Sequence, residues 1–378
     1  MLVLEIIIGL LILVVLVVIH ELGHAIVARR NGVGVEEFGI GFPPKAWGKK
    51  LKNGVLFTIN WLPLGGFVRL QGENDASKKK GDYGAATLWQ KTKILFAGVA
   101  INWLFAALLL TILAWTGLPK VIPDQFTVAS DTKVNSAPVE IVGLTKDYPA
   151  EKAGFETGDK ILEFAGTPVT TVAEVIADAR ERKGETVSVV IERDNTELTK
   201  EVTLRNDAAG GVFGAGLGQR ETTQSTWSAP IVGVALTGQF TWVTLQGLGD
   251  LLGNVASGLA LQLSTHKETR EAAQANLQEA GDSVAGPIGI LGTLFPSAER
   301  AGLTQLTLLT AIISLTLAVM NALPIPALDG GRWFVTILFR LMKRPLTKDT
   351  EERIAGIGFM ALMLLIVIVT ISDVIKLF

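Results

Sequence analysis

The sequence predicts a polytopic α-helical membrane protein with four transmembrane helices, a membrane-associated β-hairpin and an inserted extracytoplasmic α+β domain. The 378 residues are 49% hydrophobic and only 19% charged, whereas about a quarter of the residues in soluble domains are charged. Four apolar stretches reach the length of about 20 residues that a helix needs to cross a bilayer. Between the second and the third lies a long polar region with strand-like runs, which predicts the inserted domain.

Charge and residue usage exclude several classes of function. The formal net charge is −2, which excludes nucleic-acid binding through bulk positive charge. The chain has no cysteine, so disulfides, thiolate zinc sites and cysteine nucleophiles are excluded. It has only three histidines, and two of them, His20 and His24, are four residues apart. The residues that can bind a metal ion are therefore few and concentrated.

The four expected spans are Leu2–Ile19 continuing to Val27, Ile94–Leu118, Leu303–Leu328 and Ile354–Ser372. The first lacks a basic start and a small-residue cleavage site, so we expect it to be retained rather than removed as a signal peptide. Lys and Arg are concentrated between the first two spans and again in Arg340–Arg353. By the positive-inside rule, both loops are cytoplasmic, and both termini and the middle region are outside.

The uncharged stretch Thr222–Gly249 is also long enough to cross a membrane. It is rich in Thr, Gln and Gly, however, and a fifth crossing would invert the third span and place the basic Arg340–Arg353 loop outside. We therefore expect Trp227–Leu263 to form helices on or partly in the outer interface of the membrane.

These expectations divide the chain into eight parts. They are a first transmembrane helix (1–28), a cytoplasmic-side re-entrant loop and β-hairpin (29–92), a second transmembrane helix (93–118), the outer α+β domain (119–206), extracytoplasmic interfacial helices and a loop (207–302), a third transmembrane helix with a Leu-Asp-Gly turn (303–331), a cytoplasmic loop (332–353) and a fourth transmembrane helix (354–378).

Two segments after the first span predict the re-entrant loop and the hairpin. Glu36–Pro44 is apolar but punctuated by Gly and Pro, which favours an irregular re-entrant loop over a plain juxtamembrane turn. Val55–Asn60 and Phe67–Gln71 are typical of two strands joined through the intervening Trp61–Gly66 segment. The edge of such a hairpin could pair with an extended peptide.

The sequence His20-Glu21-Leu22-Gly23-His24 closes the first span. Residues four apart share one face of a helix, so both imidazoles can reach one zinc ion. Glu21 lies beside that face and can accept a proton from a water molecule that the metal acidifies. Ionisable residues are costly inside a membrane and are usually functional there, so we interpret this motif as a catalytic zinc site.

A zinc hydrolase needs a third protein ligand, and without cysteine we expect it to be a carboxylate. Asp329 is the strongest candidate, because two prolines end the third span just before it and Gly330 and Gly331 permit a tight turn. It leaves the membrane on the same side as His24. His266 lies in a polar outer stretch and is expected at the surface, and Glu5 is at the wrong depth to contribute.

Taken together, these motifs resemble the site-2 protease family of intramembrane zinc metalloproteases, in its bacterial regulator-of-sigma-E protease (RseP-like) form. The resemblance covers nearly the whole chain in order. It rests on His20–His24, PLGGFVRLQGE at 63–73, Asn102, GPIGI at 286–290 and NALPIPALDG at 321–330. Within the outer domain, Pro149–Phe155, Gly158–Ile161 and Gly166–Val169 resemble a circularly permuted bacterial PDZ domain. A loop that usually reads GFGP in the family is Gly41-Phe-Pro-Pro44 here.

The resemblance implies one Zn²⁺ per chain, with His20, His24 and Asp329 as ligands and Glu21 as general base. It further implies substrate contacts at Asn321 and Asn102, and at Gly65, Gly66 and Phe67 of the hairpin. The implied partners are the lipid bilayer and single-span membrane proteins, such as anti-sigma factors or remnant signal peptides, cut after another protease has trimmed their outer domain. The implied location is the bacterial cytoplasmic (inner) membrane, with the PDZ domain outside, where it binds peptide or excludes bulky substrates.

Two other classes of function compete with the protease. A catalytically silent membrane scaffold with a PDZ domain leaves Glu21 between two histidines unexplained. A metal transporter with a buried zinc site would need polar residues along several spans, and the second and fourth spans offer almost none.

Overall fold

The computed structural model describes residues 2–206, 211–262, 274–276, 278, 281 and 285–377. The chain forms two compact units. Unit 1 combines the chain up to Leu113 with the chain from Ala229 onward, and unit 2 is the inserted segment Ala114–Ser228. Unit 2 is thus inserted between two parts of unit 1.

The long helices of unit 1 are apolar along most of their length. They are α1 (Leu2–Arg30), α2 (Leu88–Thr116), α5 (Ala229–Gln262), α9 (Leu303–Ala322) and α11 (Lys348–Leu377). By length and composition, each of these five is able to cross a membrane. In α1 all but one of the large aliphatic side chains are exposed or half-buried, whereas Glu5, Gly9 and the histidines are buried. Such an inverted pattern suits a helix surrounded by lipid, and the expectation of a multi-pass membrane protein is confirmed.

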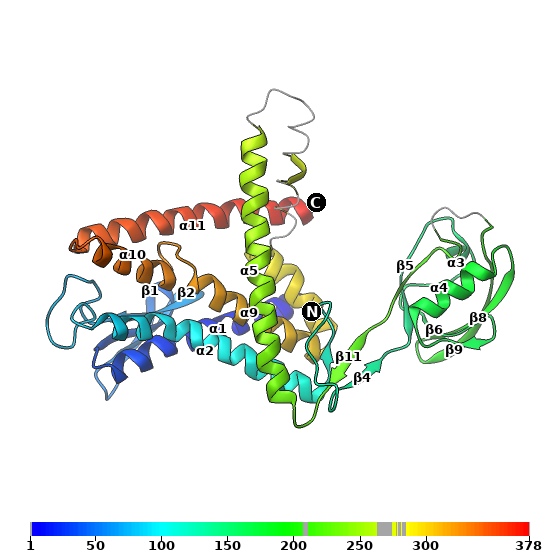
Figure 1. Cartoon of the computed structure of the whole chain (residues 1–378), viewed down its shortest axis with the longest axis horizontal. Coiled ribbons are helices and arrows are strands. Elements are labelled where there is room, and N and C mark those ends of the chain that lie inside the picture. The colour runs from blue at the N-terminus through cyan, green and yellow to red at the C-terminus, as the bar shows by residue number, and fades with distance from the viewer. Residues whose placement is uncertain are drawn as a thin grey trace. The chain divides into compact units, whose positions relative to one another are not determined.

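The interfacial region expected at Trp227–Leu263 is one continuous 34-residue helix, α5, rather than several helices. Figure 1 shows α5 crossing α2 and α9 at a steep angle, whereas α1, α2 and α9 run alongside one another. The Trp103 indole N–H donates to the Thr241 hydroxyl at 3.2 Å, which joins α2 to α5. A helix that crosses the spanning helices steeply lies closer to the plane of the membrane than they do, so the interfacial placement of α5 stays our prediction.

The hairpin differs from the expected one. Strands β1 (Val35–Lys50) and β2 (Leu56–Leu70) pair antiparallel and turn near residue 54, so the irregular loop at 36–44 and the connection through 61–66 were both wrong. Both strands bend, and Phe38 of β1 pairs with Phe57 and with Val68 of β2. The Asn60 amide donates to the Gly41 carbonyl at the bend, at 3.0 Å. Gly and Pro act here as bending points within strands rather than as strand ends.

This bending leaves one part of β2 on an edge. The first half of β1 lies between the two halves of β2, whereas residues 66–70 of β2 pair only with 35–40 of β1. The other side of the 66–70 segment therefore carries backbone groups without a strand partner among the described residues, in keeping with the exposed hairpin edge that the sequence predicts.

Helix α9, which corresponds to the third expected span, ends at Ala322, six residues before the expected end of that span. Residues 323–328 form a turn, and Asp329 begins the amphipathic helix α10 (Asp329–Leu341). The expected loop at 332–353 is thus wrong over its first ten residues, where apolar side chains recur at helical spacing between the basic ones. Short helices α7 (Pro287–Gly289), η1 (Ile290–Leu294, a π-helix) and α8 (Phe295–Arg300) precede α9.

Unit 2 is an α+β unit with two sheets and two short helices. Its elements are β3 (Leu118–Pro119), β4 (Lys133–Ser136), β5 (Val139–Leu144), α3 (Pro149–Lys152), β6 (Lys160–Phe164), β7 (Thr167–Pro168), α4 (Val172–Glu181), β8 (Thr186–Arg193), β9 (Thr196–Thr203), β10 (Ala215–Gly218) and β11 (Glu221–Gln224). The larger sheet has the order β10-β5-β6-β8-β9, with β7 on β6, and the smaller has the order β3-β11-β4.

The strands expected at 139–142, 187–192 and 198–204 and the helix at 172–182 are confirmed as β5, β8, β9 and α4. Helix α4 begins with a reciprocal capping box between Thr171 and Glu174, the signature that stabilises a helix start. The domain extends beyond the expected end at residue 206, because β10 and β11 complete the two sheets. These strands are short and rich in glycine and threonine. They therefore lack the alternation of hydrophobic and polar residues that would predict a strand.

Candidate metal centre

Helix α1 places both histidines of the His-Glu-x-x-His motif on one buried face. His20 and His24 are 7% and 8% exposed, and their Nε2 atoms lie 3.1 Å apart. The Nδ1 atom of His24 donates to the Ile94 carbonyl at 2.7 Å. Because a neutral imidazole has one donor and one acceptor nitrogen, this bond leaves Nε2 of His24 with a free lone pair.

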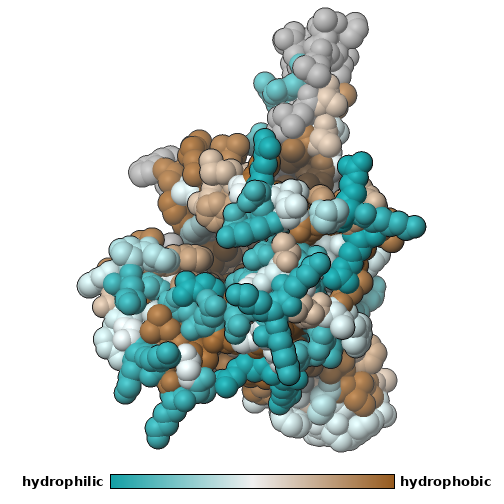
Figure 2. Space-filling view, turned by 90° about the vertical axis from the view of Figure 1, so that its left-hand side faces the viewer, coloured by the Kyte–Doolittle hydropathy of each residue, from teal (hydrophilic) through white to brown (hydrophobic). Residues whose placement is uncertain are grey.

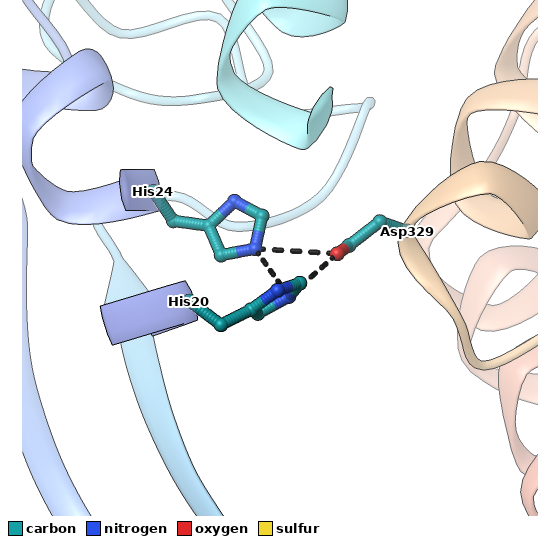
Figure 3. Close-up of side chains that lie close together, drawn as sticks. All are labelled: His20, His24 and Asp329. Atoms are coloured by element: carbon teal, nitrogen blue, oxygen red, sulfur yellow. Dashed lines mark hydrogen bonds and ion pairs between the residues drawn. The ribbon is translucent and has the colours of Figure 1, made fainter. Parts of the chain in front are cut away.

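Asp329 brings a carboxylate to the same point from 309 residues along the chain. Its Oδ2 atom lies 3.0 Å from His20 Nε2 and 3.2 Å from His24 Nε2 (Figure 3). Ligands bound at 2.0–2.1 Å around a tetrahedral zinc ion lie about 3.3 Å from one another. The three atoms therefore fit three corners of such a site, with a fourth corner left for water or substrate.

A glycine of α2 makes room for the histidines. A Cβ atom on Gly98 would lie 2.5 Å from His24 Nε2 and 2.6 Å from His20 Nε2, so any larger residue would displace the imidazoles. Gly98 is not predicted as a site residue from the sequence, because nothing in α2 alone distinguishes it from the other small residues of an apolar helix. Its position four residues before Asn102 is the one signal that could have drawn attention to it.

The turn before Asp329 is built differently from the expectation. Its left-handed residue is Ala327, with φ +83°, and not Gly330 or Gly331. The two glycines are required by space instead, since a Cβ on Gly331 would lie 1.9 Å from the Ile325 carbonyl oxygen. A non-glycine residue in the left-handed region is uncommon and strained, and here the strain is two residues from the carboxylate.

Glu21 shares a small cavity with the metal centre. The cavity has a volume of about 190 Å³ and is lined by Glu21, His24 and Asp329 together with the edge of β2. The carboxylate of Glu21 lies beside the backbone N–H of Val68. A carboxylate and two metal-ligand candidates thus face one enclosed space beside a strand edge.

The residues expected to contact substrate are distributed unevenly. Phe67 lines the cavity, and a Cβ on Gly66 would lie 3.6 Å from Glu21 Cγ, whereas Gly65 faces the Phe42 ring. Asn102 is fully buried, and neither side-chain polar atom has a hydrogen-bond partner among the described residues. The amide of Asn321 donates to the Leu317 carbonyl of its own helix at 2.9 Å, and Asn321 does not line the cavity.

The remaining candidates lie elsewhere. Glu5 forms an ion pair with Arg300, with a Glu5 Oε2 to Arg300 Nη2 distance of 2.7 Å, which agrees with its expected absence from the site. His266 lies outside the described residues. Unit 2 has a cavity of its own, about 420 Å³, between α4 and the segment 211–217.

The geometry defines a class of protein. Two imidazoles and a carboxylate that converge on one point, with a second carboxylate beside them in a cavity, are the donor set of a hydrolytic zinc site. His20, Glu21 and His24 lie on an apolar helix long enough to cross a bilayer, and Asp329 begins the helix that follows α9, another such helix, so the class is a membrane-embedded metallohydrolase.

Comparison with known proteins narrows the class to a family. The model of peptidase family M50 matches residues 8–365. The chain belongs to this family, the site-2 proteases, and is a zinc-dependent metalloendopeptidase.

Several relatives are similar over nearly their whole length. A zinc metalloprotease homologue of Clostridium perfringens is 31% identical, with 95% of each chain covered. The zinc metalloprotease RasP of Bacillus licheniformis is 26% identical, with 96% of this chain and 97% of RasP covered. The regulator of sigma-W protease RasP of Bacillus subtilis is 25% identical, with 96% of each chain covered.

Proposed function

We propose that this protease cuts the transmembrane segments of single-span membrane proteins, with zinc held by His20, His24 and Asp329 and with Glu21 as general base. One observation carries the proposal. Three ligand atoms from distant parts of the chain lie within 4.8 Å of one another, and Glu21 lines the cavity beside them.

The residues divide the chemistry between them. A zinc ion at this site supplies a Lewis acid that polarises the scissile carbonyl and lowers the pKa of a water molecule to near 7. The Glu21 carboxylate takes the proton that this water loses and passes it to the leaving amine nitrogen. The bond from His24 Nδ1 to the Ile94 carbonyl fixes the orientation and tautomer of that imidazole.

A helical peptide bond in lipid is protected by its own hydrogen bonds and by the absence of water. The substrate must therefore be unwound and held extended while it is cut. The 66–70 edge of β2 borders the cavity and has backbone groups without a strand partner there. We assign this edge to strand addition with the unwound substrate, with Gly66 and Phe67 next to the scissile bond and Asn102 as a further polar contact.

The biological setting follows from the orientation that the basic loops predict. Both termini and unit 2 lie outside the bacterial cytoplasmic (inner) membrane, and the hairpin lies on the cytoplasmic side. One relative is named regulator of sigma-W protease, and this name supports anti-sigma factors as substrates. Remnant signal peptides fit the same site. Unit 2, which resembles a PDZ domain in sequence, excludes substrates whose outer domain has not yet been trimmed.

The test is cleavage of a tagged single-span substrate by the purified, zinc-loaded protein. Replacing Glu21 by Gln keeps the shape of the side chain and removes the base, so we expect cleavage to fall by about 100- to 10,000-fold with zinc retained. Glu181→Gln on the exposed face of unit 2 is the matched control and keeps full activity. Undiminished cleavage by folded, zinc-loaded Glu21→Gln protein would overturn the proposal.

A further inference from the structure

A second cavity adjoins the metal cavity. It has a volume of about 570 Å³ and shares four lining residues, Leu70, Glu73, Asp329 and Arg332, with the 190 Å³ space beside Glu21. We call the larger cavity the vestibule. We propose that the vestibule is a separate substrate subsite, which binds the polar flank of the membrane segment that is being cut. This inference rests on the proposed function, because it requires an extended substrate on the β2 edge.

The strand edge leads into the vestibule. Val68, beside the Glu21 carboxylate, lines the metal cavity, and Arg69 and Leu70 line the vestibule. A strand rises about 3.3 Å per residue, so the distance from Val68 to Leu70 is about 7 Å. When a substrate chain pairs with this edge and is cut near Val68, its residues two to five positions from the scissile bond, on the side toward Leu70, lie in the vestibule.

Charged side chains stand at the rim of the vestibule, next to an apolar wall that includes Leu328, Val335 and Ile354. Two ion pairs stand at its rim, Glu36 with Arg69 at 3.3 Å and Lys348 with Glu352 at 3.6 Å. These four side chains are 49–65% exposed, and exposed pairs of this kind contribute little stability. Glu36, Lys348 and Glu352 can therefore exchange their partners for charges on the substrate, whereas Arg69 is also held by the buried Glu37 at 2.6 Å. Figure 2 shows that hydrophilic side chains gather on the face that carries this end of unit 1.

The inner wall is fixed, in contrast to the rim. The Arg332 guanidinium donates from Nη1 to Glu73 Oε1 at 2.9 Å, from Nη2 to the Glu73 carbonyl at 2.8 Å and from Nε to Glu351 Oε1 at 3.0 Å. It also lies over the Tyr83 ring, 4.6 Å from the centroid. Glu73 in turn accepts from the Leu70 N–H at 3.0 Å.

This network connects the two halves of the site. Arg332 is one helical turn after Asp329, and Glu73 is bonded to the last residue of β2. The Arg332–Glu73 pair therefore fixes the distance between the third ligand candidate and the strand edge, at the boundary between the two cavities. Arg332 acts as a positioning residue, because all of its bonds go to protein groups.

The absence of native cysteine gives a direct test by disulfide crosslinking. Single cysteines are placed at Glu352, which lines the vestibule, and at Arg353, the adjacent exposed residue, which does not. Both are made in Glu21→Gln protein, so that bound substrate stays intact. The probe is a single-span protein without its outer domain, which the wild-type chain cleaves, carrying one cysteine at successive positions around the cleavage point.

We expect Glu352→Cys to crosslink to positions two to five residues beyond the cleavage point at least about tenfold faster than Arg353→Cys, because a bound chain presents its thiol at roughly millimolar effective concentration. Asn74→Cys, which also lines the vestibule, repeats the test with Lys78→Cys as its control. The subsite proposal is wrong if vestibule and control positions crosslink equally, or if only the apolar centre of the substrate crosslinks. In either case, cleavage by the wild-type protein leaves the proposed function intact. Loss of cleavage by wild-type protein itself would instead overturn the proposed function.

Discussion

Both units contain buried ionisable side chains, and a cluster in unit 2 differs from the metal centre of unit 1 in how its polar atoms are satisfied. In unit 2 the Asp159 side chain, 1% exposed, accepts bonds from Arg193 Nε at 2.6 Å and Nη2 at 2.7 Å and from the Glu156 N–H at 2.8 Å. In unit 1 three lone-pair atoms face one another, and His20 Nδ1 has no partner among the described residues.

The difference separates a structural cluster from a functional one. Every charge around Asp159 has its counter-charge within the chain, so the cluster is complete once the unit has folded. With both imidazoles neutral and protonated at Nδ1, the facing atoms of His20, His24 and Asp329 are all acceptors, and converging acceptors are costly to bury without a donor. They become favourable when a cation occupies the space between them. An excess of buried acceptors over donors is therefore the physical mark of the metal centre.

The largest effect on this difference between the two clusters is expected when the third acceptor, the Asp329 carboxylate, is removed. We expect Asp329→Ala to weaken zinc binding by more than about 100-fold, because loss of a direct ligand exceeds the 10- to 100-fold cost of losing an outer-shell partner. Metal analysis of the purified protein after dialysis measures this. Asp159→Asn serves as the control and keeps stoichiometric zinc, and full zinc retention in Asp329→Ala protein would remove this residue from the ligand set.

A smaller effect is expected when the space behind the histidines is filled. Gly98→Ala places a methyl group 2.5 Å from His24 Nε2, which turns the imidazoles and should reduce zinc affinity by about 10- to 100-fold. Gly247→Ala in α5, where nothing lies within 4 Å of the added carbon, is the matched control. If both variants bind zinc like the wild type in a competition titration, the histidines do not depend on the space at Gly98.

The smallest effect on zinc binding is expected at the cluster that needs no metal. Burial by itself raises the pKa of Asp159, but bonds from Arg193 and from the Glu156 N–H hold it below its ordinary value. Stability from this group is therefore full above about pH 4, the unfolded value, and is lost as the pH falls through the folded value. We expect Asp159→Asn to destabilise unit 2 by about 3 kcal/mol at pH 7, with zinc binding unchanged.

Hydrogen exchange of unit 2 amides in the full chain, corrected for intrinsic rates at each pH, measures that effect. The difference between the wild type and Asp159→Asn should shrink below pH 4. A difference that stays constant with pH would show that packing, and not the ion pair, accounts for the stability.

The site was more predictable from the sequence than the fold around it. His20, Glu21 and His24 are close together on one helix, and the prolines before Asp329 indicate a turn there. Local sequence was therefore sufficient to propose these residues as site residues. Gly98 and Ala327 acquire their importance only from atoms that are distant in the sequence. No local pattern contains that information.

The hairpin shows the same limit at the level of whole strands. Gly41 and the prolines after it are ordinary signals for a loop, but the Asn60 amide and the paired halves of β2 bond this segment into a bent strand. Helix α10 was missed for a related reason, since the basic residues around it fit a cytoplasmic loop equally well.

The number of residues between the proposed metal ligands determines how long synthesis takes from the first ligand to the last. His20 is made early, and Asp329 follows 309 residues later, after the whole of unit 2 has been inserted between the two parts of unit 1. At 5–20 residues per second, synthesis needs roughly 15–60 s to pass from one to the other. During that interval the growing chain has two histidines and a glutamate but lacks the third proposed ligand, so the proposed zinc site forms only after both parts of unit 1 have been made.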